Sequence, residues 1–493
     1  MNQTLSEVPI IRRPWLWVAA LILYGLALNL VFIGSSPLGS HEALAAERSR
    51  EMVTLGHWTV PHLDGQPDVR KPPLPFVFTG LLAAAASGFT ETTVRAPSAL
   101  AALGIALLLM FWVRRMFGWR PALLTAFVAL TSAGFIGWGR RGEVDMQVAF
   151  WTTATLLSYW MVVTETGFAR RAAFFVIMSL SLAAGVLTKG PLTPATLVVT
   201  SLALAVAGES GRRGWRALWP MIAGGFVSIA LVAPWVFAMV QAQPDAWNVW
   251  YLEYIGRAGG AIGHDKPWHF YLTRTPAQLW GLWAIFVLLG AFLAIRYRQL
   301  PRGLAVFLLA WGLGAELLLS FSVGKRIHYA MGAQPPFLFL AGWALDRVIS
   351  APPGDWFYRF RRPVVWGVGV YAVLALVGVT VYTGIFLSKP DPAENQSVVG
   401  QYIAREVPAA DTVASYRGVG AVEVFYARRF IPVVEQNDLT AWRDQHPGGY
   451  LIVGVMQIPE LWTAHGPWQV IAPPGWQSGA SKAQAILLRV PPK

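Results

Sequence analysis

Several short stretches of this sequence place ionisable residues at the ends of long apolar runs. They are HEALAAERSREM from His41, RKPP from Arg70, GEVDM from Gly142 and LTKGP from Leu187. Ionisable groups are costly near lipid, so those found there are usually paired or functional. Lysine and arginine bind phosphate, and a neighbouring carboxylate can accept a proton from an attacking hydroxyl. The pattern therefore predicts chemistry on a lipid-linked phosphate.

Two longer hydrophilic segments add candidate groups. The segment WYLEYIGRAGGAIGHDKPWHFYL begins at Trp250, and SVGKRIHYA begins at Ser322. Both lie between apolar runs and both contain aromatic residues, which are enriched at membrane interfaces. They contribute the candidates Glu253, Arg257, His264, Lys266, Lys325, Arg326, His328 and Tyr329.

Structural roles compete with these functional ones. Asp145 directly precedes an apolar run and is also typical of a helix N-cap. Lys189, beside Gly190 and Pro191, can bind an anion or simply extend its ammonium group to the interface. The stretch from His41 to Leu55 has the composition of an amphipathic helix, which predicts a helix on the membrane surface or a solvated loop helix.

The composition shows what kind of molecule must position these groups. The chain has 493 residues, of which 55% are hydrophobic and 13% are charged. Soluble domains contain about 25% charged residues, so this composition indicates a polytopic membrane protein. The net charge of +13 comes from basic residues scattered between apolar runs, so no nucleic-acid partner is expected. The absence of cysteine excludes disulfides and thiolate metal sites.

Apolar runs define the expected architecture, an all-α polytopic protein of about eleven transmembrane helices. The stretch Pro72 to Phe89 is interrupted by proline at its start, so we expect it to lie at the interface or to re-enter. The eleven predicted spans are 14–34, 96–113, 120–138, 146–164, 172–188, 191–207, 217–240, 277–295, 303–321, 329–346 and 364–386.

Basic residues orient these spans. By the positive-inside rule, alternate connections that carry arginine face the cytoplasm. These residues are Arg12, Arg13, Arg114, Arg115, Arg120, Arg170, Arg171, Arg212, Arg213, Arg216, Arg296, Arg298, Arg302, Arg347, Arg359, Arg361 and Arg362. The segments predicted to face outward are 35–95, 139–145, 188–190, 241–276, 322–328 and the chain after 387.

The C-terminal part of the chain differs in character. Short β-prone runs, DTVASY, YLIVGV, WQVIA and AILLRV, alternate with helical stretches such as VVGQYIAREV. This alternation predicts a small extramembrane α/β domain over 388–493. The sequence thus divides into a membrane domain, 1–387, whose first outer segment 35–95 carries interfacial helices, and this outer domain.

The ordered series of motifs resembles the polytopic glycosyltransferases of the GT-C superfamily. The series is HEALAAERSREM, GHWTVPHLDG, RKPP, EVDM, LTKGP, WYLEYIGRA, KPWHFYL and GKRIHY. More narrowly, it is similar to the bacterial aminoarabinose transferases of lipid A and to bacterial protein mannosyltransferases. The resemblance extends over roughly residues 14–345 and rests on the order of the motifs, since each one alone is weak.

This resemblance implies a GT-C fold, a polyprenyl-phosphate sugar donor, an active site at the periplasmic face of the cytoplasmic membrane, and transfer with inversion. It assigns catalytic positions to His41, Glu42 and Asp145. It assigns the donor phosphate to Lys71, Lys189, Arg257, Lys325 and Arg326, with Tyr329 at the aromatic position of the last motif. Glu143, Glu253, His264 and Lys266 complete the expected substrate loops.

Two departures from the family pattern bear on the catalytic base. The usual Asp–Glu pair of the first loop is His41–Glu42 here, and Leu44 stands where arginine is expected. Arg70 replaces the acidic residue that often precedes the lysine of the KP motif. Glu42, His41 and Asp145 remain alternative bases, and we favour Glu42 with Asp145 as its partner.

Other functions and ligands stay open at this point. Transporters or flippases of lipid-linked sugars also need phosphate contacts, although they usually place their site at mid-membrane between repeats. A protein O-mannosyltransferase and a non-catalytic scaffold are further alternatives. The acceptor is a lipid or a protein. No cofactor is required by the pattern, but His41, Glu42 and Asp145 are groups that bind a divalent cation.

Overall fold

The protein is described here by a computed structural model of residues 13–86, 88–209, 213–256, 258–260, 263–389, 395–418, 420–458, 461, 468–476 and 485–491. These residues form two compact units. The first unit contains the chain up to Val31, Val69–Pro75 and Arg95–Thr380. The second unit contains Phe32–Asp68, Phe76–Val94 and the chain from Val381. The first hydrophilic segment therefore groups with the C-terminal region, whereas the sequence-based division at 387 assigned it to the membrane domain.

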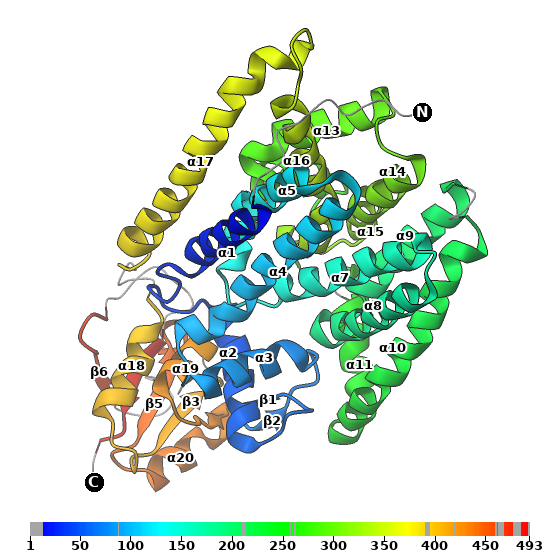
Figure 1. The fold of residues 1–493 in the computed structure, drawn as a ribbon. Coiled ribbons are helices and arrows are strands. Elements are labelled where there is room, and N and C mark those ends of the chain that lie inside the picture. Colours follow the sequence, from blue (N-terminus) through cyan, green and yellow to red (C-terminus); the bar gives the residue numbers. More distant parts are fainter. Residues whose placement is uncertain are drawn as a thin grey trace. The chain divides into compact units, whose positions relative to one another are not determined.

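The first unit is a bundle of apolar helices (Figure 1). Helices α7, α8, α9 and α10 run side by side in it. Its helices are α1 (Pro14–Leu30), α4 (Glu91–Phe117, entering from the second unit), α5 (Trp119–Thr131), α6 (Ala133–Gly139), α7 (Asp145–Thr164), α8 (Phe168–Lys189), α9 (Leu192–Ala207), α10 (Trp215–Ala242), α11 (Ala246–Trp250), α12 (Phe270–Thr275), α13 (Ala284–Arg296), α14 (Arg302–Leu309), α15 (Ala315–Ser320), α16 (Pro335–Ile349) and α17 (Arg361–Val381).

Within the described part of the chain, six helical segments are long and apolar enough to cross a membrane. They are Glu91–Phe117, Phe168–Lys189, Trp215–Ala242, Phe270–Arg296, Arg302–Ser320 and Trp356–Phe386. Helices α5 and α6 form a seventh candidate, bent by 56°. The chain is therefore a multi-pass membrane protein. The predicted count of eleven also includes the shorter helices α1 and α9, and α7 and α16, which neighbouring helices bury along most of their length.

Small residues let the helices of this unit approach closely. A Cβ atom on Gly342 of α16 would lie 2.6 Å from the backbone nitrogen of Thr125 in α5. A Cβ atom on Gly290 of α13 would lie 2.8 Å from the carbonyl carbon of Leu340 in α16. Van der Waals packing at small residues is a main source of association between helices in lipid, where apolar side chains gain little from leaving the solvent. These glycines therefore fix the contacts of α16 with α5 and α13.

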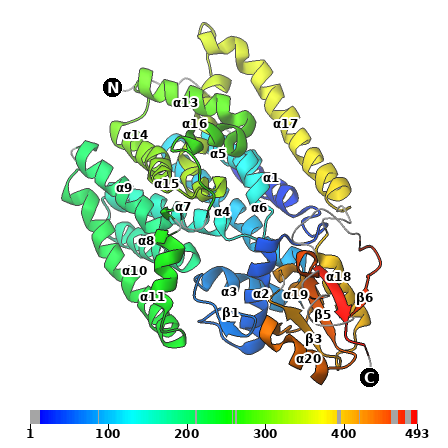
Figure 2. The same cartoon turned by 180° about the vertical axis from the view of Figure 1, so that it is seen from behind.

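The second unit contains a small α/β domain, as predicted (Figure 2). Its five-stranded sheet has the order β4-β3-β5-β7-β6, with β3 parallel to β4 and β5 and with β7 antiparallel to β5 and β6. The elements of this unit are α2 (Ser40–Leu55), β1 (His62–Leu63), β2 (Gln66–Pro67), α3 (Leu74–Ala85, entering from the first unit), α18 (Ser397–Glu406), β3 (Val413–Tyr416), α19 (Ala421–Ala427), β4 (Val433–Val434), α20 (Leu439–Gln445), β5 (Tyr450–Gly454), β6 (Gln469–Ile471) and β7 (Ala485–Arg489).

Helix α2 packs into this unit through one small apolar face. Ala43 and Ala46 are fully buried in a cluster with Val422 and Phe425 of α19. Charged residues of α2 are buried as well: Arg48 forms an ion pair of 2.7 Å with Asp68, and the carboxylate of Glu51 accepts hydrogen bonds from two backbone N–H groups. Arg48 and Glu51 belong to the charged pattern that predicted a helix on the membrane surface, and both side chains bind groups of the protein.

Candidate active site beside the first turn of α7

Asp145 and Lys189 form a buried ion pair where α7 begins and α8 ends. The short connection after α7 turns the chain back, so the last residue of α8 returns to the first turn of α7. The Lys189 ammonium donates a hydrogen bond to Oδ1 of Asp145. The Asp145 side chain is 5% exposed and that of Lys189 is 18% exposed. Desolvating two charges is expensive, so a pair held at this depth calls for a functional explanation.

The N-cap role that the sequence allows for Asp145 is not observed. The N-cap of α7 is Val144, and no side-chain cap hydrogen bond is made there. Asp145 is the following residue and directs its carboxylate to Lys189. The Lys189 ammonium lies 4.5 Å from the ring centroid of Tyr329, a cation–π contact, so the lysine is held by protein groups at both sides.

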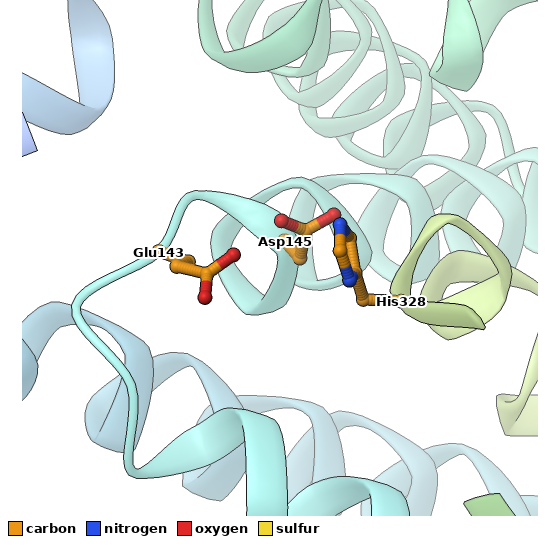
Figure 3. A group of neighbouring side chains, drawn as sticks. All are labelled: Glu143, Asp145 and His328. Carbon is orange, nitrogen blue, oxygen red and sulfur yellow. The ribbon is translucent and has the colours of Figure 1, made fainter. Parts of the chain in front are cut away.

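His328 and Glu143 extend the site around Asp145 (Figure 3). Each of these three side chains offers one ligand atom, and the three atoms lie within 4.8 Å of one another. His328 belongs to a 3-10 segment, Ile327–Ala333, and its ring centroid lies 4.4 Å from that of Trp138, with the two planes tilted by 55°. Burial lowers the pKa of His328 to about 4, although the Asp145 carboxylate opposes the shift. The imidazole is therefore neutral near pH 7 and retains one nitrogen lone pair.

These three groups fit a divalent cation by donor type. Carboxylate oxygens and a neutral imidazole are common ligands of Mn²⁺, Zn²⁺ and related ions. The ammonium of Lys189, however, already neutralises Asp145. A bound cation would therefore have to displace or share this contact.

Lys71 and Glu253 form a second ion pair in the same unit. Lys71 lies on the short segment Val69–Pro75, and Glu253 is 8% exposed. The indole N–H of Trp250 donates a hydrogen bond of 2.8 Å to the carbonyl of Val69, which ties this segment to the helical turn that carries Glu253. Lys71 also contributes to the electrostatic field that favours the ionised form of Asp145.

The segments around His264 and Lys325 lie against each other. The backbone N–H of Lys325 donates to the carbonyl of His264 at 3.1 Å, and the Arg326 guanidinium lies 2.5 Å from Nε2 of His264. The Lys325 ammonium is buried and donates to the carbonyl of Lys266 at 3.0 Å, while Lys266 itself is exposed. The structure thus brings these predicted residues together. Arg257, predicted to contact phosphate, lies outside the described residues.

The predicted first-loop pair, His41 and Glu42, belongs to the second unit. Glu42 is buried and accepts a hydrogen bond of 2.9 Å from the backbone N–H of Gly39, in a capping box at the start of α2. His41 is exposed. Glu42 therefore has a clear structural role, stabilising the first turn of its helix.

Sequence reasoning missed the groups that support the 3-10 segment carrying His328. Glu316, buried in α15, accepts hydrogen bonds from Thr275 at 3.0 Å and from Gln334 at 3.1 Å. Gln334 in turn accepts from the indole of Trp280 at 2.8 Å. The signal was present, because Glu316 is a carboxylate within an otherwise apolar run. Sequence reasoning also missed Trp138, whose ring contacts that of His328. Its position shortly before the GEVDM motif was the only signal for it.

An apolar pocket of about 480 Å³ lies between α8, α10 and α11. Val186 contributes to it from α8, three residues before Lys189, so the apolar pocket and the charged site share one end of this helix. It is lined by Val186, Ser228, Ile229, Val232, Ala233, Val236, Phe237, Val240 and Trp247.

Comparison with known proteins supports the resemblance found in the motifs. Residues 70–237 match the family described as dolichyl-phosphate-mannose-protein mannosyltransferase. An undecaprenyl phosphate-alpha-4-amino-4-deoxy-L-arabinose arabinosyl transferase of Edwardsiella ictaluri is 30% identical over 62% of this chain and 55% of its own length. The Aeromonas hydrophila protein of that name is 29% identical over 73% of this chain and 64% of its own length. The matches thus cover less than two thirds of these relatives.

Solved structures define the fold. ArnT from Cupriavidus metallidurans, bound to undecaprenyl phosphate, superposes with a TM-score of 0.80 at 19% identity, over 96% of this chain and 98% of that one. The archaeal oligosaccharyltransferase AglB from Archaeoglobus fulgidus superposes with a TM-score of 0.57 at 12% identity, over 90% and 70% of the two chains. The fold is therefore that of the GT-C membrane glycosyltransferases. The chain is similar in sequence to the aminoarabinose transferases and in fold to ArnT.

Proposed function

We propose that this protein is an integral membrane glycosyltransferase that moves a sugar from a polyprenyl-phosphate donor to a lipid acceptor of the lipid A type. The observation that carries the proposal is the buried Asp145–Lys189 pair, in which a carboxylate able to act as a base meets a cation able to bind phosphate. Val186, one turn before Lys189 in α8, lines an apolar pocket that could receive part of a lipid chain. The names of the similar arabinosyl transferases support the donor class.

The lysines of the site would bind the donor phosphate. Lys71 and Lys189 each contact a carboxylate in the described structure. The donor is a phosphodiester with one negative charge shared by two oxygens, so it can accept hydrogen bonds from more than one lysine and would draw Lys189 away from Asp145. Arg326 and Lys325 would add positive charge, and Tyr329, whose ring contacts Lys189, would help to orient that lysine.

Asp145, released from Lys189, would then act as the general base. In the transfer step the acceptor hydroxyl attacks the anomeric carbon from the face opposite the phosphate. Its proton passes to the carboxylate, the sugar–phosphate C–O bond breaks, and the electron pair leaves with the phosphate. The lysines stabilise the charge that grows on this leaving group. Glu42 remains the alternative base, and inversion at the anomeric carbon follows from direct displacement.

The membrane arrangement is part of the proposal. We infer that the eleven apolar runs cross the cytoplasmic membrane and that Asp145 and the C-terminal domain face the periplasm. The arginine-rich connections support this orientation. A divalent cation at Glu143, Asp145 and His328 is compatible with the donor set. The step described above does not depend on it, because the lysines already neutralise the phosphate.

The test is sugar transfer by purified protein supplied with labelled polyprenyl-phosphate sugars and with lipid or peptide acceptors. Asp145→Asn should lower kcat about 100-fold or more, the usual contribution of a general base. Asp346→Asn is the matched control, because it removes a carboxylate from a different ion pair, that with Arg120. Full activity of Asp145→Asn together with an inactive Glu42→Gln would transfer the role of base to Glu42. Transfer to peptides alone would replace the lipid acceptor with a protein.

A further inference from the structure

Two histidines of the second unit, His57 and His62, lie in direct contact. Neither belongs to the site around Asp145. Nδ1 of His57 is 3.0 Å from Nε2 of His62. His57 follows the end of α2 and is exposed, whereas His62 starts β1 and is 8% exposed. One imidazole is thus held in the protein and the other is open to solvent.

Hydrogen bonding fixes the tautomer of the buried imidazole. Nδ1 of His62 lies 2.9 Å from the carbonyl oxygen of Val60. A carbonyl only accepts hydrogen bonds, so Nδ1 of His62 carries the proton and Nε2 presents its lone pair to His57. Histidines that bind metals usually donate their second ring N–H to a carbonyl or carboxylate in this way.

The ring geometry differs from that of a simple hydrogen bond between imidazoles. The ring centroids are 4.3 Å apart and the planes meet at 45°. A straight N–H···N bond of this length would separate the centroids by roughly 5.3 Å, the N···N distance plus about one ring radius on each side. The two rings therefore lean toward each other more than a straight hydrogen bond would allow. Two imidazoles that coordinate the same metal ion adopt such an arrangement.

The N···N distance also selects a coordination geometry. Two imidazole nitrogens at about 2.0–2.1 Å from one ion lie about 2.9 Å apart at a right angle and about 3.3 Å apart at the tetrahedral angle. The observed 3.0 Å is close to the right-angle value. Right-angled coordination by nitrogen and oxygen ligands is the preference of Cu²⁺ and Ni²⁺.

We propose that His57 and His62 form a chelating site for a divalent transition-metal ion of the Cu²⁺ or Ni²⁺ type. Among the described residues, no third histidine, aspartate or glutamate has a ligand atom close enough to complete the set. Water or another exchangeable ligand fills the remaining positions. On binding, His57 changes tautomer: solvent takes the proton from Nδ1 and returns one to Nε2, so that Nδ1 of His57 and Nε2 of His62 each coordinate the ion with a lone pair. The bound ion thereby connects the segment after α2 to the start of β1.

The experiment is a titration of tag-free, full-length protein in detergent with CuCl₂, followed by electron paramagnetic resonance. We expect one Cu²⁺ per chain with hyperfine coupling to two imidazole nitrogens. His57→Gln should weaken binding at least about tenfold, since even the loss of a supporting group commonly has that effect. It should also leave a single-nitrogen signal. His57 is exposed, so this variant should fold, which its melting temperature verifies.

Two control variants locate the ion. His269→Gln removes another exposed imidazole and should leave both affinity and spectrum unchanged. His328→Gln removes the imidazole near Asp145 and should also leave the two-nitrogen spectrum intact. The proposal is overturned if His57→Gln binds Cu²⁺ like the wild type, if His328→Gln abolishes the signal, or if no stoichiometric binding occurs. These readouts do not involve sugar transfer, so their outcome is independent of the proposed function.

Discussion

Glu423 is a buried carboxylate whose replacement should stabilise the C-terminal domain at neutral pH. It lies in the first turn of α19, is 1% exposed, and neither carboxylate oxygen has a hydrogen-bond partner among the described residues. Burial raises its pKa from 4.5 to about 8. The side chain is therefore protonated in the folded protein at pH 7, whereas it is ionised in the unfolded chain.

The size of the effect follows from this difference in pKa. A group whose pKa is raised on folding stabilises the native state least at high pH, because the unfolded chain loses its proton first. From pH 5 to pH 7 the free energy of unfolding that is lost through the raised pKa of Glu423 grows by about 1.4 kcal/mol per pH unit, or about 3 kcal/mol in all. Glutamine has the same shape and does not ionise. Glu423→Gln should therefore be nearly neutral at pH 5 and stabilising by about 3 kcal/mol at pH 7.

Hydrogen exchange measured by mass spectrometry can test this locally. Opening free energies of peptides from α18, α19 and β5 are compared between variant and wild type at the same pH, so that intrinsic exchange rates cancel. Glu435→Gln, at an exposed position of the same domain, is the control and should change nothing. A difference for Glu423→Gln that does not grow between pH 5 and pH 7 would refute the inference that Glu423 is buried without a partner.

Three other perturbations test the first unit. Lys189→Gln should cost about 3 kcal/mol because it leaves Asp145 as an unpaired buried charge, and adding Asp145→Asn should recover most of the loss in denaturant melts. Gly342→Ala should destabilise by about 1–3 kcal/mol through its clash with α5, whereas Gly378→Ala, in open space, should not lower the melting temperature. Acidification from pH 6.5 to 4.5 should destabilise the wild type by about 2 kcal/mol more than His328→Asn, because the unfolded imidazole takes up a proton there to a much greater extent than the buried one.

The secondary structure could be predicted from sequence wherever the pattern is local. Each predicted span overlaps a helix, and the four β-prone runs of the C-terminal domain form β3, β5, β6 and β7. Hydropathy and strand propensity act over a few residues, so they can be read along the chain. Helix α7 shows the limit: its apolar run predicted a span, but not that other helices surround it along most of its length, which depends on neighbours distant in sequence.

The candidate site was predictable in its components but not in its pairing. Asp145, Lys189 and Lys71 were singled out from their positions at the ends of apolar runs, and Glu253 from an outer segment with aromatic residues. The sequence could not show that Asp145 pairs with Lys189 or Lys71 with Glu253, because the partners are 44 and 182 residues apart. The charges of α2 likewise suggested a solvated face, although Arg48 is paired with Asp68, 20 residues away.

The sequence by itself determined that this is a multi-pass membrane protein with a small α/β domain and with ionisable groups at helix ends. Those properties follow from the cost of exposing polar groups to lipid, which constrains each segment separately. Only the tertiary structure decided which charges neutralise each other, that the 3-10 segment brings His328 to Asp145, and that His57 meets His62. The first two depend on the packing of segments distant in sequence, and the third on the path of the chain between α2 and β1, because ion pairs and ligand sets form between whichever side chains the fold brings within a few ångströms.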